Sequence, residues 1–551
     1  MPRRTDSARH KVLGGFLFSG FIVAAASQSA VQVFDRERVL SNAKKHAHFL
    51  IERVDMAHRG TIYSSDGKVV AQSVEGFLLG LNYSKVPASP GFFVSLSAAT
   101  GVSATELADR PEKMNGRVWR KALTPEQAEA VRTIRRQWSA DGVSLERSSD
   151  RFYPMSEVFA GVTGCQRSGE SLNGLEKSQD GRLGGVDGES SGYVDRTGVF
   201  VTDPADPGTK PINGESITLT IDSQLQTAAM QALRAGVEAN KAKSGAAVVI
   251  DPKTGEILAM VNWPTFDPNS GWKPGHDFNM AYMGVYEPGS TFKILTVAKA
   301  LDSGHVSIND FAQCNGEIRV GDRTLHCDDH GGHRAHGSVS VEDAIARSCN
   351  VSAAQWALRI GRSDMISFMD SMEIFQKPRL GLPSERNGVF NRNDPGKRVQ
   401  LATVGFGQSM ACSPVNLAGA YSMLANNGVM MRPHVIRGEN ETVGQVVKPQ
   451  TAETVMRLME SVIQSERGTG KALKIPGYRL AGKTGTAQKI GTAKDQYMAN
   501  FVGYVPARDP RAVVLVMIDT PSAGQIYGGT VAGPVFVNIA KAVIRRFNIP
   551  S

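Results

Sequence analysis

Hydrophobic and polar residues in the C-terminal part of the chain follow two periods, one typical of strands and one typical of helices. Short alternating or continuous apolar runs predict strands, and apolar positions three or four residues apart predict helices. The predicted strands are 216–222, 245–250, 256–261, 500–505 and 512–518, and the predicted helices are 224–239 and 533–547. Because strands at both ends enclose mostly helical sequence, residues 215–551 are predicted to form an α+β domain, in which an antiparallel sheet is flanked by helices.

The sequence before residue 215 has a different pattern of apolar and polar residues. From residue 58 to residue 214, short apolar pieces are separated by glycine, serine, aspartate and proline, which predicts a mixed α/β module with many loops. Residues 35–55 are rich in charge and carry apolar positions at helical spacing, so they are predicted to form a stalk helix. Residues 35–214 are therefore interpreted as a stalk and pedestal domain.

The most apolar stretch lies near the N-terminus. Residues 12–34 contain no charged residue, and at about 1.5 Å per residue they would cross a hydrocarbon core of about 30 Å as one helix. Four of the first eleven residues are Lys or Arg, which marks the cytoplasmic side of a span. We therefore expect a cytoplasmic tail at 1–11, a single transmembrane anchor at 12–34 and the rest of the chain outside the cytoplasm. A cleaved signal peptide is the alternative, because Ala24 and Ala26 offer an A-x-A pattern.

Composition excludes several classes of protein. The chain has 551 residues, of which 41% are hydrophobic and 21% charged, so it is neither a disordered nor a polytopic membrane protein. The formal charge of +9 is not gathered in a long basic run, and nucleic acid is not an expected partner. Five cysteines are too few for a disulfide scaffold of this length.

One serine stands at the start of a predicted apolar helix. Lys293 lies three residues after Ser290 and on the same face, so its amine can reach the Ser290 hydroxyl. The amine can take the hydroxyl proton only if burial or neighbouring cations lower its pKa. Ser-x-x-Lys alone carries little information, because it also begins at Ser41, Ser65 and Ser270.

A second short motif follows downstream. Ser348-Cys349-Asn350 lies between two predicted helical runs, 341–347 and 353–360. A loop between two helices can aim a hydroxyl and an amide at one point. The position and order of this motif, rather than its composition, separate it from other Ser-x-Asn sequences in the chain.

A third motif is Lys483-Thr484-Gly485-Thr486, in a stretch with strand-like sequence. Gly485 is expected to let a substrate approach the strand edge closely, because it has no side chain. Another Lys-Thr-Gly begins at Lys253, but it lies in a predicted hairpin turn and is interpreted as structural.

The three motifs in this order form the signature of penicillin-binding proteins and class A β-lactamases. The chain carries further segments typical of monofunctional, class B penicillin-binding proteins: Arg59-Gly60-Thr61-Ile62-Tyr63, Arg151-Phe152-Tyr153-Pro154, Gly174-Leu175-Glu176 and Tyr527-Gly528-Gly529. It therefore resembles this family over most of its length after about residue 58. The C-terminal pattern is most similar to the cell-division, or septal, branch.

The resemblance implies a penicillin-binding/serine β-lactamase-like transpeptidase domain that needs no cofactor. Its substrate would be the peptidoglycan stem peptide ending in D-Ala-D-Ala, cross-linked through an acyl-enzyme. The expected roles are Ser290 as nucleophile, Lys293 as base, Ser348 as proton relay, Asn350 for the substrate amide, Lys483, Thr484 and Thr486 for the terminal carboxylate, Gly485 for close approach, and the N–H groups of Ser290 and Thr486 as oxyanion hole.

The resemblance also implies a location in the bacterial inner membrane, with the catalytic domain periplasmic or extracellular, and it implies partners. No glycosyltransferase motif of the Glu-Asp-x-x-Phe type precedes residue 215, so a separate membrane glycan polymerase is expected, together with other division proteins. β-Lactams are the expected inhibitors. An elongation-type transpeptidase is the main alternative. A secreted β-lactamase would not need the pedestal or the anchor, and a membrane β-lactam sensor would need a cytoplasmic output domain.

Cysteine and histidine are unusually dense between the first two motifs. Two cysteines, Cys314 and Cys327, are accompanied by four histidines: His326, His330, His333 and His336. A disulfide between the two cysteines is favoured because the compartment is expected to be oxidising, and it would close a loop of about 14 residues. Free thiols are an alternative. A metal site formed by Cys314, Cys327, His330 and His333 is the third possibility.

Overall fold

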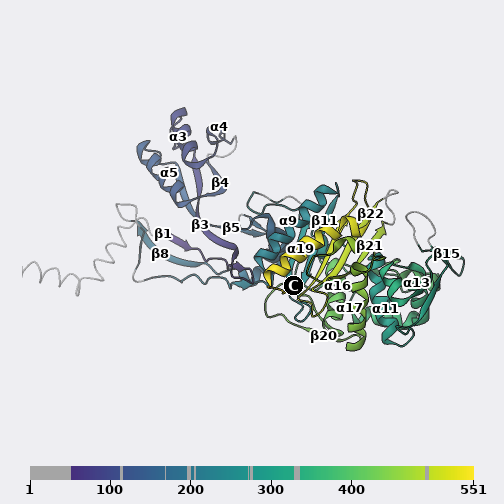
Figure 1. Cartoon of the computed structure of the whole chain (residues 1–551). Coiled ribbons are helices and arrows are strands. Elements are labelled where there is room, and N and C mark those ends of the chain that lie inside the picture. Colours follow the sequence, from purple (N-terminus) through teal and green to yellow (C-terminus); the bar gives the residue numbers. More distant parts are fainter. Residues whose placement is uncertain are drawn as a thin grey trace, which may run out of the picture. The chain divides into compact units, whose positions relative to one another are not determined.

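The computed structural model describes residues 51–111, 116–167, 169–194, 200–203, 206–270, 272, 277–327, 335–489 and 496–551. Within these ranges, no helix has both the length and the apolar character needed to cross a bilayer. The predicted tail and anchor, residues 1–34, lie outside the described residues. The chain divides into two compact units, Met1–His58 with Gly185–Asn213, and Arg59–Gly184 with Gly214–Ser551 (Figure 1).

In its described part, the first unit is a small antiparallel sheet in the order β1-β8-β9. Its strands are β1 (Ile51–Asp55), β8 (Gly188–Val194) and β9 (Phe200–Thr202). The predicted stalk helix was therefore wrong for residues 51–55, which form β1. The backbone of β1 pairs with β8, more than 130 residues later, and this long-range pairing overrides the local helical spacing.

The second unit begins with a sheet built around one long strand. β3 (Val69–Asn82) pairs on one side with β5 (Val143–Phe152) and elsewhere with β2 (Ile62–Tyr63) and β4 (Gly116–Leu123). α3 (Pro90–Thr100) and α5 (Pro125–Gln137) pack on this sheet and enclose a separate apolar core. Thr124 starts α5 with a capping box.

A buried network of ion pairs connects three segments of this unit that are far apart in the sequence. Glu176, on α7 (Gly174–Ser178), is fully buried and accepts bonds from Arg59 Nε at 2.6 Å and Arg151 Nε at 2.7 Å. The hydroxyl of Tyr153 lies 3.4 Å from the same carboxylate. One carboxylate thus bridges two guanidinium groups that have almost no access to water, and Arg59 also pairs with Asp180 at 2.7 Å.

We expect Glu176→Gln to destabilise the protein strongly. The amide keeps the shape but leaves the buried Arg151 without its carboxylate partner and Arg59 with Asp180 alone, which costs about 3–5 kcal/mol. Thermal unfolding of the variant should occur about 5–10 °C lower. Glu170→Gln, at an exposed position of the same region, is the matched control and should melt like the wild type. Equal melting temperatures for both variants would contradict the role of the network.

The central sheet of the second unit has five antiparallel strands in the order β12-β11-β23-β22-β21 (Figure 1). Its strands are β11 (Ser244–Ile250), β12 (Ile257–Trp263), β21 (Ala481–Gln488), β22 (Tyr497–Val505) and β23 (Ala512–Asp519). The predicted strands in these regions are confirmed. In contrast, the predicted strand at 216–222 is reduced to β10 (Ile217–Thr218).

Helices cover both faces of this sheet, which explains why β11, β12 and β23 are almost continuously apolar. Val514 and Val516 of β23 face a core shared with α9 (Ser223–Ala239) and α19 (Gly533–Arg546). Val513 and Leu515 face the other core, in which α16 (Pro414–Ala425) contacts β11 and β23, and α17 (Pro449–Gln464) contacts β21. The predicted α+β architecture is confirmed.

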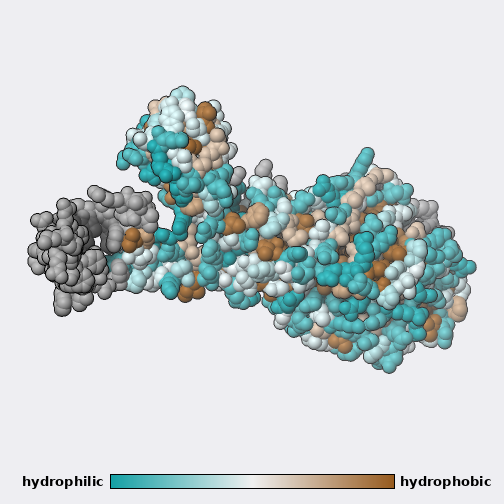
Figure 2. Space-filling model, turned by 60° about the vertical axis from the view of Figure 1, so that its left-hand side comes forward, coloured by the Kyte–Doolittle hydropathy of each residue, from teal (hydrophilic) through white to brown (hydrophobic). Residues whose placement is uncertain are grey.

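Further helices and short strand pairs surround the open edge of the sheet and the region beyond it. They include η1 (Gly289–Phe292), α11 (Lys293–Asp302), α12 (Val341–Ala346), α13 (Asn350–Ile360), α14 (Arg362–Ser371), α15 (Lys397–Val404), β13 (Phe311–Cys314), β14 (Glu317–Val320), β15 (Arg323–His326) and β16 (Gly337–Ser340). The remaining elements are α4 (Ala104–Ala108), α6 (Glu157–Thr163), α8 (Asp180–Leu183), α10 (Met280–Met283), α18 (Gly528–Val531), η2 (Lys471–Leu473), β6 (Gln166–Arg167), β7 (Glu170–Ser171), β17 (Val389–Phe390), β18 (Met410–Ala411), β19 (Val429–Met431) and β20 (Thr442–Gln445). The face shown in Figure 2 is mainly hydrophilic, with small groups of apolar residues on it.

Candidate active site

The first motif lies where a 3-10 turn becomes an α-helix. Ser290 is in η1, and Lys293 is the first residue of α11, so the α-helix begins three residues later than the sequence predicted. Lys293 is buried, and its Nζ lies 3.0 Å from Ser290 Oγ. The predicted contact between this amine and this hydroxyl is therefore present.

The amine of Lys293 also contacts the second motif. Its Nζ donates to the backbone carbonyl of Ser348 at 2.6 Å and lies 3.1 Å from Ser348 Oγ. It donates to Asn350 Oδ1 at 2.5 Å. These contacts place the hydroxyls of Ser290 and Ser348 around one buried nitrogen.

The loop between α12 and α13 gives Ser348 its direction. Ser348 has a φ of 58°, in the left-handed region that a serine seldom adopts. Its N–H donates to the carbonyl of Ile345 at the end of α12, and Cys349 caps the N-terminus of α13. Asn350 Nδ2 donates to the carbonyl of His326 at 3.0 Å. Hydrogen bonds on both sides of Ser348 thus stabilise its strained backbone. Strained conformations of this kind cluster at functional sites.

The third motif lies on the edge strand of the central sheet. β21 pairs only with β22, so its other edge is unpaired within the sheet. Lys483, in this strand, is fully buried, and its Nζ lies 2.9 Å from Ser348 Oγ. Ser348 Oγ therefore connects the amines of Lys293 and Lys483.

The electrostatic environment favours a neutral amine at the third motif. Burial lowers the pKa of Lys483 well below its ordinary value, and the positive charge of Lys293 lowers it further. Because both ammonium groups approach the same hydroxyl, the doubly charged state of the pair is disfavoured. Protons can therefore be accepted within this group of side chains.

Gly485 has a different role from the predicted one. A Cβ at this position would lie 2.1 Å from Asn500 Oδ1, so the glycine makes room for a side chain of β22 and not for a ligand at the strand edge. Asn500 Nδ2 in turn donates to the carbonyl of Pro288 at 3.3 Å, two residues before Ser290. Gly485 therefore lets β21 approach the segment that carries Ser290.

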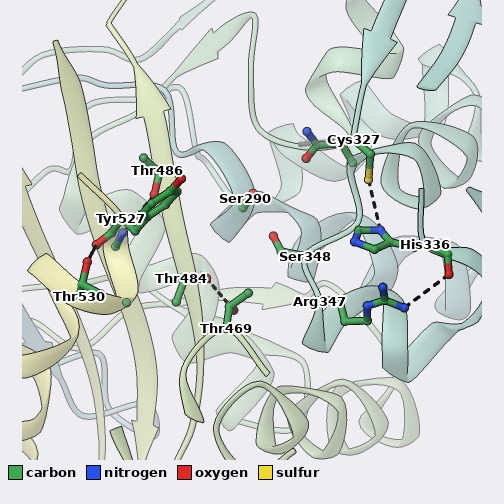
Figure 3. A pocket seen from close by; sticks show the side chains of 13 residues that line it. Ser290, Cys327, His336, Arg347, Ser348, Thr469, Thr484, Thr486, Tyr527 and Thr530 are labelled. Carbon is green, nitrogen blue, oxygen red and sulfur yellow. Dashed lines mark hydrogen bonds between the residues drawn. The ribbon is translucent and has the colours of Figure 1, made fainter. Parts of the chain in front are cut away.

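A cleft with a volume of about 370 Å³ joins the three motifs (Figure 3). Its lining includes Ser290, Ser348, Asn350, Thr484 and Thr486 from the predicted site. The residues that sequence reasoning did not assign to the site are Cys327, His336, Arg347, Thr469, Tyr527, Gly528, Gly529 and Thr530. The Tyr527-Gly528-Gly529 segment had been noted as typical of the family, and this signal could have placed it at the cleft.

Thr469 shows how such a residue reaches the cleft. Its hydroxyl lies 2.9 Å from Thr484 Oγ1, and its N–H donates to the carbonyl of Ala346 at 3.1 Å. Another pair of residues in the cleft lining is also in contact, because the N–H of Gly528 donates to Thr486 Oγ1 at 3.0 Å. Both contacts fix the hydroxyl-bearing face of β21 from segments that are distant in sequence.

The cysteine- and histidine-rich segment meets the cleft from the side of Ser348. All five cysteines are free in the structure, so the favoured disulfide between Cys314 and Cys327 is not formed. His330 and His333, the predicted metal-ligand alternatives, lie outside the described residues. The structure instead brings His336 and Cys349 beside the two cysteines, and contact with Cys349 lowers the pKa of the Cys327 thiol.

Comparison with known families decides the relationship. The penicillin-binding protein transpeptidase domain matches residues 245–541, and the penicillin-binding protein dimerisation domain matches residues 54–171. The chain belongs to the class B penicillin-binding proteins. It therefore carries the transpeptidase domain of an acyl-transferring enzyme, as the sequence motifs implied.

Curated relatives and solved structures of the family support this assignment. "Probable peptidoglycan D,D-transpeptidase PenA" of Neisseria meningitidis is 33% identical, with 88% of this chain and 83% of the relative covered. "Peptidoglycan D,D-transpeptidase FtsI" of Escherichia coli is 32% identical over 78% of this chain and 72% of the relative. The crystal structure of penicillin-binding protein 3 from Mycobacterium tuberculosis with aztreonam has a TM-score of 0.67 and 27% identity, covering 90% of this chain and 98% of the other.

Proposed function

We propose that this penicillin-binding protein cross-links peptidoglycan stem peptides ending in D-Ala-D-Ala, with Ser290 as its nucleophile. One observation carries the proposal: the three motifs, which are separated by 55 to 193 residues, meet around Ser348 Oγ at one cleft. Surface serine and lysine pairs do not produce such convergence. The names of the relatives PenA and FtsI support the same reaction.

In the first half-reaction, Ser290 Oγ attacks the carbonyl carbon of the penultimate D-alanine, and its proton passes to the amine of Lys293. Because the doubly charged state of the lysine pair is disfavoured, one of the two amines is neutral, and acylation uses the form in which this amine is Lys293. The tetrahedral intermediate collapses when the C–N bond breaks. Ser348, which contacts both lysine amines, returns a proton to the leaving amine of D-alanine. The product is an ester between the donor peptide and Ser290.

In the second half-reaction, an amine of a neighbouring stem peptide attacks the ester. The new peptide bond forms as the bond to Ser290 Oγ breaks, and the proton of the amine returns to the serine through the same side chains. The backbone N–H groups of Ser290 and Thr486 are the proposed oxyanion hole in both steps. No redox or metal chemistry enters this sequence of steps.

Substrate binding uses the open edge of β21. An extended donor peptide can add beside this strand through backbone hydrogen bonds. Its terminal carboxylate would then lie near Lys483, Thr484 and Thr486, of which the two threonines line the cleft. Asn350 is the proposed partner of the substrate amide, and in the free enzyme its Oδ1 accepts a hydrogen bond from Lys293.

Purified protein incubated with a D-Ala-D-Ala stem peptide and an acceptor amine should release D-alanine and form cross-linked product. Penicillin should abolish both products, because it acylates the same hydroxyl. Mass spectrometry of the products and of the labelled protein measures each outcome. Rapid repeated hydrolysis of penicillin without cross-linking would identify a β-lactamase instead. Stable penicillin labelling with no release of D-alanine would identify a sensor.

A septal role, as opposed to elongation, is the finer proposal. Its support is the similarity of the chain to FtsI and the family-typical C-terminal segment that contributes Tyr527 and Gly528 to the cleft. Depletion of the protein in its host should then block division and leave filamentous cells. Rounded cells with intact septa would favour the elongation role. A membrane glycan polymerase and other division proteins are the proposed partners.

The cytoplasmic membrane is the proposed location, with the catalytic domain outside the cytoplasm. The support is the uncharged run 12–34, its basic flank and a substrate that is located outside the cytoplasm. Carbonate extraction of membranes tests the anchor, since an anchored chain stays with the lipid. N-terminal sequencing that begins near residue 27 would show a cleaved signal peptide.

A further inference from the structure

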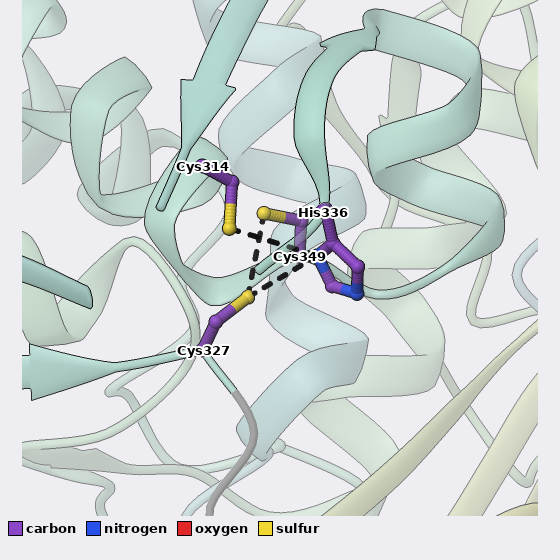
Figure 4. A group of neighbouring side chains, drawn as sticks. All are labelled: Cys314, Cys327, His336 and Cys349. Carbon is purple, nitrogen blue, oxygen red and sulfur yellow. Dashed lines mark hydrogen bonds between the residues drawn. The ribbon is translucent and has the colours of Figure 1, made fainter. Parts of the chain in front are cut away.

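Three thiols and one imidazole lie together beside the active site, and the proposed mechanism uses none of them. The ligand atoms of Cys314, Cys327, His336 and Cys349 all lie within 4.8 Å of one another. Figure 4 shows the three sulfur atoms and the imidazole converging on one small volume. The cysteines are buried, and the histidine is partly buried.

Three of the six separations between these atoms are close to those of four ligands around one ion. Cys327 Sγ lies 3.5 Å from Cys349 Sγ and 3.3 Å from His336 Nδ1, and Cys314 Sγ lies 3.7 Å from the same nitrogen. With Zn–S bonds of about 2.3 Å and Zn–N bonds of about 2.0–2.1 Å, a tetrahedral site requires ligand separations of about 3.5–3.8 Å. Three cysteines and one histidine form one of the donor sets of structural zinc sites, and thiolate-rich tetrahedral sites select zinc among the common divalent ions. We propose that Cys314, Cys327, His336 and Cys349 bind one structural Zn²⁺.

Backbone hydrogen bonds position three of the ligands independently of any ion. Cys314 ends β13, which pairs with β16, and the N–H of His336 donates to the Cys314 carbonyl at 3.1 Å. Cys327 follows β15, and its N–H donates to the carbonyl of Gly316 at 2.8 Å. Two short antiparallel strand pairs therefore deliver Cys314, Cys327 and His336 to the same point.

The fourth ligand, Cys349, comes from the loop between α12 and α13. Hydrogen-bond donors that can stabilise a thiolate lie around its sulfur atom. Cys349 is the N-cap of α13, where the helix N-terminus favours negative charge. Ser352, which is fully buried, directs its hydroxyl and its N–H at Cys349 Sγ, at 3.1 and 3.4 Å. Such donors to a ligand sulfur are typical of the surroundings of bound metals.

The site connects the ion to catalysis through the chain itself. Cys349 stands between Ser348 and Asn350, and the Asn350 amide donates to the carbonyl of His326, the residue before Cys327. A bound ion would therefore hold the Ser348–Asn350 loop against the strand pairs and keep Ser348 Oγ between the two lysine amines. This positioning role rests on the proposed function, whereas the binding of metal does not.

A disulfide leaves fewer thiols than zinc binding or free thiols, and the metal content separates the last two. Binding of one Zn²⁺ displaces up to three thiol protons and involves no oxidation. A disulfide between any two of the three clustered cysteines would instead leave three of the chain's five cysteines as thiols. The two states are therefore distinguishable on one sample.

The test uses the full chain, purified with a tag that contains no histidine and without added chelator. We expect about one zinc ion per chain by elemental analysis, and five titratable thiols once the protein is denatured with a chelator present. Cobalt loaded in place of zinc should give the thiolate absorption of a tetrahedral site. Three thiols without zinc would overturn the proposal in favour of a disulfide. Five thiols without zinc, even after zinc is supplied, would overturn it in favour of free thiols.

Substitution of the proposed ligands tests whether these residues bind the zinc ion. Cys327→Ser and Cys349→Ser each remove one of the four proposed ligands and should be purified without zinc, and Cys412→Ser, at a buried thiol outside the cluster, should keep it. Retention of one zinc by Cys349→Ser would contradict the site. If the ligand variants do not fold, removal of zinc from the wild type should lower its melting temperature, and an unchanged value would contradict a structural ion. Ser290→Ala should keep the zinc, so failure of the proposed nucleophile and failure of the metal site are separate results.

Discussion

Replacing Ser290 by alanine is expected to remove acylation by penicillin completely while leaving the protein folded. The wild type should gain one penicilloyl mass, and the variant should gain none, since loss of a serine nucleophile lowers such reactions by about 10⁶-fold. The substitution removes one contact of Lys293 but leaves its bonds to Ser348 and Asn350, so we expect little change in melting temperature.

Ser65→Ala is the matched control for this experiment. Ser65 also begins a Ser-x-x-Lys sequence, with Lys68, but it lies outside the cleft lining and its N–H bonds to the carbonyl of Ile221. This variant should label like the wild type. Stoichiometric labelling of Ser290→Ala would reject Ser290 as the nucleophile, and peptide mapping would then locate the true one.

Lys293→Arg is expected to lower the acylation rate by at least about 10³-fold, or about 4 kcal/mol of transition-state stabilisation. The guanidinium keeps a positive charge but cannot lose a proton at neutral pH, so it cannot accept the proton of Ser290. The larger group must also fit where four atoms lie 2.5–3.1 Å from the present amine. Stopped-flow measurement of penicillin acylation gives the rate.

Lys299→Arg controls for a change from lysine to arginine in the same helix. Lys299 is near the end of α11, where its ammonium lies 6.0 Å from the centre of the Phe368 ring, and arginine can make the same contact. We expect its acylation rate to equal that of the wild type. A loss of tenfold or less in Lys293→Arg would show that another group, such as Lys483, accepts the proton.

The central sheet could be predicted from sequence because its strands are buried on both faces. The apolar runs of β11, β12 and β23 are local signals that no distant contact needs to correct. β1 could not be predicted in this way, because its partner β8 lies far along the chain. The 3-10 turn at Ser290 was likewise hidden, since helical spacing does not distinguish it from the first turn of α11.

The catalytic motifs were predictable because each is compact, whereas the thiol cluster is not. Its four members are spread over 36 residues, and two strand pairs and a helix cap bring them together. In the sequence, Cys349 is the variable middle position of the Ser348-Cys349-Asn350 motif, and His336 is one of four nearby histidines. Neither residue type nor spacing indicated which histidine would face the sulfur atoms.

The unpaired edge of β21 has a consequence for how the protein avoids aggregation. A free strand edge is a surface on which two molecules can join their sheets and aggregate. Here the exposed part of that edge lies in a cleft, with Thr469 and Tyr527 among its walls. A narrow extended peptide can enter such a space, but the rigid sheet of another folded protein cannot. The walls of the cleft therefore leave the edge of β21 accessible to a single extended chain. They prevent the same edge from pairing with the sheet of a second folded molecule.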